Sequence, residues 1–391
     1  MAGSIVKRGE RTWLVRISSS TDGKRSFHNH TVHGTKRDAE RYLNAALRSR
    51  DLGTFVEPAR MTVDAYLDKW LETAARPRVR PRTFQDYAWL LRQYVRPALG
   101  ARRLDQVTPL DIQALYTAMG ERVTARTVRS THNVVRNAFK QAVLWRMLPQ
   151  NPAANVTLPK GERKEMRALT AEEAERFRRA ADELEREDRV PAGKKRPAGR
   201  SVHGFVFTFT LATGMRPGEV LALRWQDCDL EAGRVTVRRN LVRLKGGVVR
   251  FDEPKTPKSR RVLPLPSSVA ERLRAHRREQ AELRLLLGPE YADQGLVFAN
   301  LTGGPLDSHN LTGRDLKAIL RRAGLPQGLR WYDLRHTCAT LLLAAGENAK
   351  VVSERLGHAA VTLTLDLYAH VLPGMQERAA ERLEEMLFGR G

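Results

Sequence analysis

The stretch LRWYDLRHTCATLLLAAGENAKVVSERLGHAAVTLTLDLYAHV, residues 329–371, combines apolar runs with side chains suited to phosphate chemistry. Arg335 and His358 can hold an anion, because guanidinium and imidazole groups donate hydrogen bonds to phosphate oxygens. Tyr332 and Tyr368 each carry a phenol, which serves either as a nucleophile or as part of a core. The rest of the chain bears on this choice.

The charge of the chain points to a polyanionic partner. The chain has 391 residues, and its 68 Lys and Arg residues outnumber its 44 Asp and Glu residues, giving a net charge of +24. This excess is spread over every third of the chain. Such a field attracts phosphates, and each neutralised phosphate releases counterions. A basic surface that serves only solubility is the alternative.

Cysteine usage and hydropathy indicate the compartment. Cys228 and Cys338 lie in apolar segments without metal-ligand spacing, so we expect neither a disulfide framework nor a metal site. No apolar run approaches a bilayer span, and the N-terminal MAGSIVKRGERTW has no signal-peptide core. The sequence therefore predicts a cytoplasmic, nucleoid-associated protein without a membrane partner.

Residues 1–53 predict a small α+β unit, a three-stranded sheet with one helix. Apolar and polar residues alternate from Trp13, turn at Asp22-Gly23 and resume. Thr35 then begins a helix, with Asp38 completing a capping box. Basic strands suit a β-ribbon that enters the major groove of DNA, and solvated basic strands are the alternative. The candidate DNA-binding residues here are Arg11, Arg16, Lys24 and Arg25.

Residues 60–150 predict an all-helical bundle. Four helices follow from the spacing of apolar residues, the first beginning at Thr62. Thr108, Pro109 and Asp111 mark a helix start, with a side-chain cap, a first-turn proline and an acid facing the helix dipole. The last helix places basic residues opposite an apolar face, as expected of a helix lying along DNA. Its candidate DNA-binding residues are Arg126 and Arg129.

Residues 165–391 predict a mainly helical region with a short antiparallel sheet. Two buried helices meet at residues 213–216, and Pro217 fits the first helical position. Arg216 then lies at a helix N-terminus, where backbone N–H groups favour an anion. The stretch RVTVRRNLVRLKGGVVRF, residues 234–251, alternates as strands do and turns at Gly246-Gly247.

Five motifs, taken in order, resemble the tyrosine recombinases of the phage integrase family. They are ATGMRPGEVLALRWQDCDL (212–230), KTPKSRRVLPL (255–265), YDLRHTCATLLLAAG (332–346), LGH (356–358) and LDLYAHV (365–371). The resemblance implies a multidomain fold, with an arm-type DNA-binding domain at 1–53, a SAM-like core-binding domain at 60–150 and a catalytic domain at 165–391. It implies a site-specific DNA recombinase of a prophage or other mobile element, which integrates or excises DNA through a 3′-phosphotyrosyl intermediate.

Two arginines form the phosphate clamp in this resemblance. It implies that Arg216 and Arg335 bind the scissile phosphate and that Glu219 supports Arg216. Planar guanidinium groups with paired donors offset the charge of the pentavalent transition state better than lysine does. The phosphotyrosyl bond conserves the energy of the broken phosphodiester, so we expect no ATP, metal or other cofactor.

A lysine, a histidine and a tyrosine complete the implied catalytic set. Lys255 would protonate the departing 5′-oxygen, with Lys258 in the same loop as the alternative. His358 would contact the phosphate, and Tyr368 would be the nucleophile, its phenol activated by a base or a positive field. A helix cap for His358 and a core position for Tyr368 are the alternatives.

Tyr332 departs from the family pattern. Family members usually have a histidine three residues before the second arginine, and this chain has Tyr332, which we expect in front of a helix. A phenol can donate a hydrogen bond to a phosphate oxygen. We therefore expect Tyr332 to be a substituted phosphate ligand and not the nucleophile. His336, directly after the arginine, is generally structural in the family.

The C-terminal PGMQERAAERLEEMLFG, residues 373–389, predicts an amphipathic helix. In the family such a tail packs on a neighbouring protomer, which implies a homotetramer on double-stranded attachment-site DNA. Packing on its own domain is the alternative. An excisionase or a host DNA-bending protein is a further expected partner. A catalytically silent DNA-binding protein and a topoisomerase-like nickase are the alternative functions.

Overall fold

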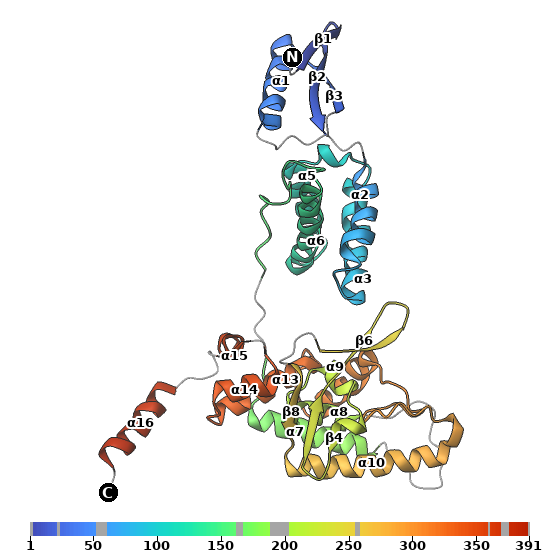
Figure 1. The fold of residues 1–391 in the computed structure, drawn as a ribbon. Coiled ribbons are helices and arrows are strands. Elements are labelled where there is room, and N and C mark those ends of the chain that lie inside the picture. The colour runs from blue at the N-terminus through green and yellow to red at the C-terminus, as the bar shows by residue number, and fades with distance from the viewer. Residues whose placement is uncertain are drawn as a thin grey trace. The chain divides into compact units, whose positions relative to one another are not determined.

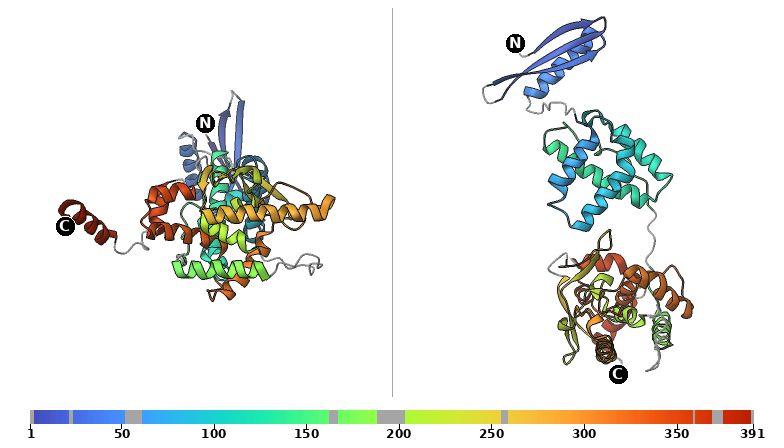
Figure 2. Two further views of the ribbon diagram at one scale, coloured as in Figure 1. Left: turned by 90° about the horizontal axis from the view of Figure 1, so that it is seen from below. Right: turned by 90° about the vertical axis from the view of Figure 1, so that its right-hand side faces the viewer.

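The structure is a computed structural model, and it describes residues 3–21, 24–51, 61–161, 167–187, 203–254, 259–358, 360–368 and 375–389. The chain divides into two compact units, residues 1–163 and 164–391 (Figures 1 and 2). Most of its regular structure is helical, and its sheets are small and antiparallel, as predicted.

The first unit begins with a sheet in the order β1-β2-β3, followed by one helix. The elements are β1 (Gly3–Gly9), β2 (Thr12–Thr21), β3 (Lys24–His33) and α1 (Lys36–Asp51). Val15 and Ile17 are buried in one cluster with residues of α1. Because side chains alternate across a strand, Arg16 lies on the opposite, exposed face. The predicted turn at 22–23 lies outside the described residues.

The capping box predicted at the start of α1 is present. The backbone N–H of Thr35 donates to the Asp38 carboxylate at 2.8 Å, and the backbone N–H of Asp38 donates to the Thr35 hydroxyl at 3.3 Å. These two bonds satisfy donors that the first turn of a helix leaves without an intrahelical acceptor. The local sequence therefore sets where this helix begins.

Helices with a core of their own fill the rest of the first unit. Tyr66, Leu91 and Val128 are fully buried within this core. The predicted start at Thr108 is present, since its hydroxyl accepts from the backbone N–H of Asp111 at 3.2 Å. The elements are α2 (Val63–Trp70), η1 (Leu71–Ala75), α3 (Pro81–Leu90), η2 (Leu91–Val95), α4 (Arg96–Leu99), η3 (Leu104–Gln106), α5 (Pro109–Gly120) and α6 (Ala125–Leu144).

The second unit packs helices around two small sheets. One sheet has the order β4-β5-β8, and β6 pairs with β7 as a separate hairpin. Its strands and short 3-10 or π-helical segments are β4 (Cys228–Asp229), β5 (Arg234–Val237), β6 (Asn240–Arg243), β7 (Val249–Asp252), β8 (Arg261–Pro264), η4 (Trp225–Asp227), η6 (Gly288–Glu290) and η7 (Leu311–Leu316). Its helices are α7 (Ala171–Glu187), α8 (Gly204–Thr213), α9 (Pro217–Leu221), α10 (Ser267–Leu287), α11 (Ser308–Asn310), α12 (Lys317–Arg322), α13 (Trp331–Ala344), α14 (Ala349–Leu356), α15 (Val361–Tyr368) and α16 (Met375–Phe388).

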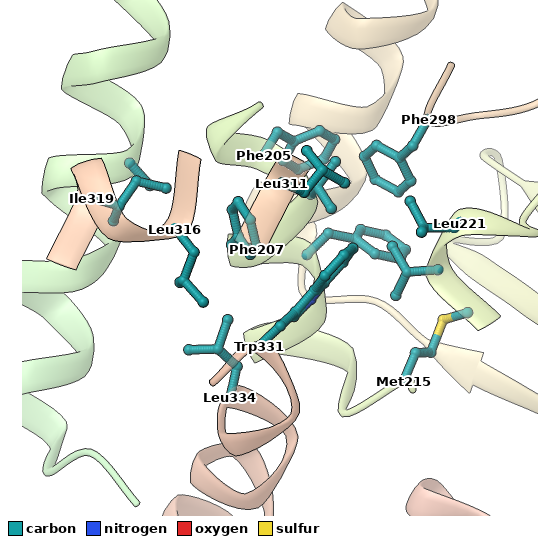
Figure 3. Close-up of a cluster of buried hydrophobic side chains, with 14 of the residues drawn as sticks. Phe205, Phe207, Met215, Leu221, Phe298, Leu311, Leu316, Ile319, Trp331 and Leu334 are labelled. Atoms are coloured by element: carbon teal, nitrogen blue, oxygen red, sulfur yellow. The ribbon is translucent and has the colours of Figure 1, made fainter. Parts of the chain in front are cut away.

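The core of the second unit fixes the start of α13. Trp331 and Leu334 point from α13 into a cluster that includes Phe207 and Phe298 (Figure 3). The Trp331 ring lies edge-on to Phe207 at 5.0 Å, and its indole N–H donates to the Thr210 hydroxyl at 2.9 Å. The residues that follow Trp331 on this helix are therefore held in a fixed orientation.

Tyr332 does not precede a helix, contrary to the expectation from sequence. It is the second residue of α13, because the Asp333 carboxylate accepts from the backbone N–H of Arg330 at 2.8 Å and sets the helix start at Trp331. Across the described ranges, no helix is long and apolar enough to cross a membrane. Cys228 and Cys338 are both free thiols.

Candidate active site

Arg335 is the buried centre of the candidate site. Its side chain projects from α13 and is 1% exposed. One Nη donates to the carbonyl of Gly214 at 2.7 Å, and the other donates to the carbonyl of Leu356 at 2.7 Å. These carbonyls lie at the C-terminal ends of α8 and α14, where the helix dipole favours a cation. Burial and the nearby Arg216 lower the pKa of Arg335 to about 10, so it stays charged at neutral pH.

Arg216 lies close to Arg335, since both side chains donate to carbonyls at the end of α14. It is the residue before α9, and its backbone N–H donates to the Glu219 carboxylate at 3.0 Å. Its guanidinium donates to Glu219 Oε1 at 2.7 Å and to the carbonyl of Gly357 at 3.1 Å. Because Leu356 and Gly357 are consecutive, the end of α14 brings the two guanidinium groups together. The Arg216 side chain keeps 30% of its surface exposed and is the accessible member of the pair.

Glu219 holds a second arginine that the sequence reasoning missed. The Arg261 side chain on β8 donates to Glu219 Oε2 at 2.9 Å and to the carbonyl of Arg355 at 2.6 Å. Burial alone would raise the pKa of Glu219, but the charges of Arg261 and Arg216 lower it below its ordinary value. The carboxylate is therefore ionised and offsets one of the three positive charges of Arg216, Arg261 and Arg335.

Glu219→Gln should destabilise the second unit. The side chain is 3% exposed, and its neutralisation would leave Arg261 buried without a compensating charge. We expect the free energy of unfolding to fall by about 3 kcal/mol. Urea unfolding followed by circular dichroism measures this change. Glu187→Gln, which breaks an exposed pair with Arg322, should cost much less, because surface ion pairs contribute little to stability. Equal losses in the two variants would contradict the structural role of Glu219.

His358 follows the end of α14 and is tied to α15. Its backbone N–H donates to the carbonyl of Ser353 at 3.0 Å, and its Nδ1 lies 2.8 Å from the hydroxyl of Thr364. Burial, together with the positive charges of Arg335 and Arg216, lowers the pKa of His358 to about 4. The imidazole is therefore neutral at pH 7, so the arginines and not His358 supply the positive field.

Tyr332 lies one helical turn before Arg335 on α13. Residues three apart on a helix share a face, so its phenol and the guanidinium project to the same side. The Tyr332 side chain is 40% exposed, and its ring centroid lies 5.1 Å from that of His336. His336 is 5% exposed, and burial lowers its pKa to about 4. Of these two side chains, Tyr332 is the one that a ligand can reach.

Mild acid should destabilise the second unit. Burial lowers the pKa values of His276, His336 and His358 to about 4 in the folded state. An unfolded histidine has a pKa near 6.5, so the unfolded state binds more protons between these values and is favoured as pH falls. We expect a loss of about 2 kcal/mol between pH 7 and pH 5 from the deeply buried His276, and a smaller loss from each of His336 and His358, whose charged forms are partly screened by solvent.

Urea midpoints at pH 7 and pH 5 measure this effect. The loss should be smaller in His336→Gln than in the unchanged chain, because one titrating group has been removed. Glu219 contributes to acid unfolding only at lower pH. Its folded-state pKa is lowered, so its carboxylate keeps its stabilising charge until pH falls through that pKa. Equal midpoints at the two pH values would contradict the burial of neutral histidines.

The predicted nucleophile, Tyr368, lies among the described residues, whereas the two candidates for the general acid do not. Tyr368 is the last residue of α15, four residues after Thr364, whose side chain is fully buried and bonded to His358. The helix that ends at Tyr368 is thus anchored beside the clamp. Lys255 and Lys258 lie outside the described residues, in the segment between β7 and β8. Arg261 joins the start of β8 to Glu219.

The candidate DNA-binding residues lie on the first unit. Arg11 is exposed between β1 and β2, and Arg16 is on the open face of the sheet. Arg126 and Arg129 are exposed on α6, where Arg129 also donates to the carbonyl of Pro159 at 3.2 Å. Lys24 and Arg25 belong to β3, but their side chains lie outside the described part of the structure. Among the residues that are described, no cluster of His, Cys, Asp and Glu could hold a metal ion.

Two family models match parts of this chain. Residues 167–375 match the model of the phage integrase family, and residues 62–120 match that of the phage integrase N-terminal SAM-like domain. A protein named tyrosine recombinase XerC-like from Caldanaerobacter subterraneus subsp. tengcongensis is 28% identical, over 98% of this chain and 98% of that protein.

Solved structures share the fold. The Tn1549 transposon integrase in complex with transposon right end DNA gives a TM-score of 0.67 at 23% identity, covering 83% of this chain and 99% of that one. A lambda integrase tetramer bound to a Holliday junction gives 0.54 at 17% identity, covering 92% and 96%. With the family model spanning more than half of the sequence, the chain belongs to the phage integrase family of tyrosine recombinases, the enzymes of site-specific DNA recombination.

Proposed function

We propose that this protein cuts one DNA strand at each of two attachment sites and rejoins the strands to new partners, integrating or excising a prophage or other mobile element. The observation that carries this proposal is the pair of guanidinium groups of Arg216 and Arg335, held on consecutive carbonyls at the end of α14. Such a pair attracts the singly charged phosphodiester and offsets the larger negative charge of the transition state.

In the proposed reaction Tyr368 is the nucleophile. Its phenolic oxygen forms a bond to the scissile phosphorus while the bond from phosphorus to the 5′-oxygen breaks. The neutral imidazole of His358 can accept the phenolic proton, and Lys255, or Lys258 in the same segment, gives a proton to the 5′-oxygen. The 5′-hydroxyl of the partner strand then attacks the 3′-phosphotyrosine, which restores the phenol and the DNA backbone.

Tyr332 takes the place of the usual family histidine as a phosphate ligand. Its position one turn before Arg335 favours a hydrogen bond from the phenol to a non-bridging oxygen of the phosphate.

The rest of the chain would deliver DNA to this site. We assign residues 1–53 to arm-type binding, residues 60–150 to core binding and residues 165–391 to catalysis. The exposed apolar residues of α16 need a covering surface, and a homotetramer on double-stranded DNA would provide it. Those residues are Leu383, Met386, Leu387 and Phe388. The lambda integrase structure is likewise a tetramer, bound to a Holliday junction. An excisionase or a host DNA-bending protein would determine whether DNA is integrated or excised. The reaction would take place in the cytoplasm, at the nucleoid.

A nicked suicide DNA tests the function. The substrate is duplex DNA from the sequence flanking the gene, and a denaturing gel reveals any covalent protein–DNA adduct. An adduct, together with strand exchange between two paired sites, supports the recombinase. An adduct with relaxation of supercoiled DNA that lacks paired sites would indicate a nickase. Salt-sensitive binding without any adduct would indicate a silent DNA-binding protein.

A further inference from the structure

A second arginine-rich site lies at the start of the strand that carries Arg261. It is a hollow of about 400 Å³ in the second unit. Four arginines and two other side chains line it: Arg224, Arg238, Arg239, Phe251, Glu253 and Arg260. Arg260 lines this hollow while the next residue, Arg261, bonds to Glu219 of the clamp. The two sites are therefore neighbours that share one short segment of chain.

Two of the arginines are held in place by a buried acid. Asp227 is 6% exposed, and its carboxylate lies 2.7 Å from a guanidinium nitrogen of Arg239 and 3.4 Å from Nε of Arg238. The same carboxylate accepts from the backbone N–H of Arg224 at 3.3 Å. This acid orients the arginines but balances only one of their charges.

Arg224 has no ion-pair partner among the residues that are described. Its guanidinium lies over the ring of Phe251 at 5.3 Å, and its buried Nε donates no hydrogen bond to any described group. Arg260 pairs with Glu253 at 2.8 Å, but both of these side chains are largely exposed. The four arginines thus exceed the two acids, Asp227 and Glu253, by two positive charges.

We propose that this hollow binds a phosphate of the DNA backbone other than the scissile phosphate. Two uncompensated guanidinium charges with oriented donors fit a tetrahedral phosphate oxyanion. Double-stranded DNA carries one negative charge per about 1.7 Å of its axis, so a duplex seated at the clamp brings further phosphates to adjacent surfaces. The inference rests on the proposed function, and it assigns to Arg224 and Arg260 a DNA-binding role that the catalytic motifs do not include.

The test removes two charges from the hollow without disturbing Asp227. Arg224→Gln together with Arg260→Gln keeps the contacts of Arg239 and Arg238 with the buried Asp227. The matched control is Arg278→Gln with Arg284→Gln, two exposed arginines of α10 outside the hollow. Fluorescence anisotropy on intact, unnicked duplex DNA from the sequence flanking the gene measures Kd at several salt concentrations. Urea unfolding checks that both variants are folded.

We expect the hollow variant to bind DNA about tenfold more weakly, with the slope of log Kd against log salt reduced by about 0.9, the value of one phosphate. The control should keep the wild-type slope. A methylphosphonate replaces one charged phosphate with a neutral group. In a series of duplexes with one such group each, at least one should bind the wild type more weakly and bind the hollow variant, Arg224→Gln with Arg260→Gln, as strongly as unmodified DNA does. The modified position in that duplex should differ from the scissile phosphate.

Two results would overturn the inference. One is a hollow variant with the salt slope and methylphosphonate profile of the wild type. The other is calorimetry in which inorganic phosphate binds the wild type and not the hollow variant while DNA affinity is the same in both, which would assign the hollow to a free anion. A wild type that binds DNA without forming an adduct would count against the proposed chemistry and leave the affinity comparison valid.

Discussion

Tyr368→Phe will form no covalent adduct with nicked suicide DNA and will still bind that DNA. The change removes a single oxygen atom, the one that would bond to phosphorus, so no phosphotyrosyl intermediate can form. Binding depends on many phosphate contacts along the duplex and does not need this atom. Peptide mapping of the wild-type adduct should accordingly identify the segment that contains Tyr368.

Tyr332→Phe is the matched control, because it removes the same atom from the other candidate phenol. As a phosphate ligand, Tyr332 contributes one hydrogen bond to the transition state, so its loss should slow adduct formation roughly 10- to 100-fold without preventing it. The fold supports this assignment: Tyr332 belongs to the first turn of α13, whose start is held by Trp331 in the core. An adduct retained in Tyr368→Phe and mapped to Tyr332 would reverse the two roles.

Local signals in the sequence predicted the elements that carry the site. Pro217 after Arg216 marks a first helical position, and the structure has Arg216 directly before α9. The capping residues at Thr35 and Thr108 also predicted where two helices begin. Each of these signals lies within a few residues of the feature it determines, and so it can be read without knowledge of the tertiary structure.

The contacts that assemble the site have no such signal. Arg216 reaches the carbonyl of Gly357, 141 residues away, and Arg261 reaches Glu219, 42 residues away. A backbone carbonyl is present at every residue, so no residue type reveals that Leu356 and Gly357 are the acceptors. Arg261 has no local signal either. It is one of 68 basic residues in the chain, and only its buried partner, Glu219, distinguishes it from the others.

Arg335→Lys should slow adduct formation by about 10²- to 10³-fold, a loss comparable to removing one oxyanion donor. The guanidinium is planar, and its two bonds to the carbonyls of Gly214 and Leu356 fix that plane. A lysine ammonium keeps the charge but is a point donor that cannot span both carbonyls and a phosphate. The rate of adduct formation with excess enzyme on suicide DNA measures the loss.

Arg330→Lys is the control, since Arg330 lies at the start of the same helix and its side chain is 66% exposed. Arg335→Lys will also lower stability, because two buried carbonyls lose their donors. The rate is therefore compared per folded molecule, at a temperature where urea unfolding shows both variants folded. If Arg335→Lys is less stable but forms the adduct as fast as Arg330→Lys, then Arg335 has only the structural role of bonding the ends of α8 and α14.

The comparison of rate with affinity separates the clamp from ordinary DNA contacts. Each basic residue that contacts the duplex contributes a screened charge. The loss of one such residue therefore weakens binding modestly and lowers the salt dependence of Kd. At the scissile phosphate, negative charge increases during the reaction, and donors fixed there act more strongly on the transition state than on the bound substrate. Arg335→Lys should thus change the rate far more than Kd, whereas Arg224→Gln with Arg260→Gln should change Kd and leave the rate in the bound complex unaltered.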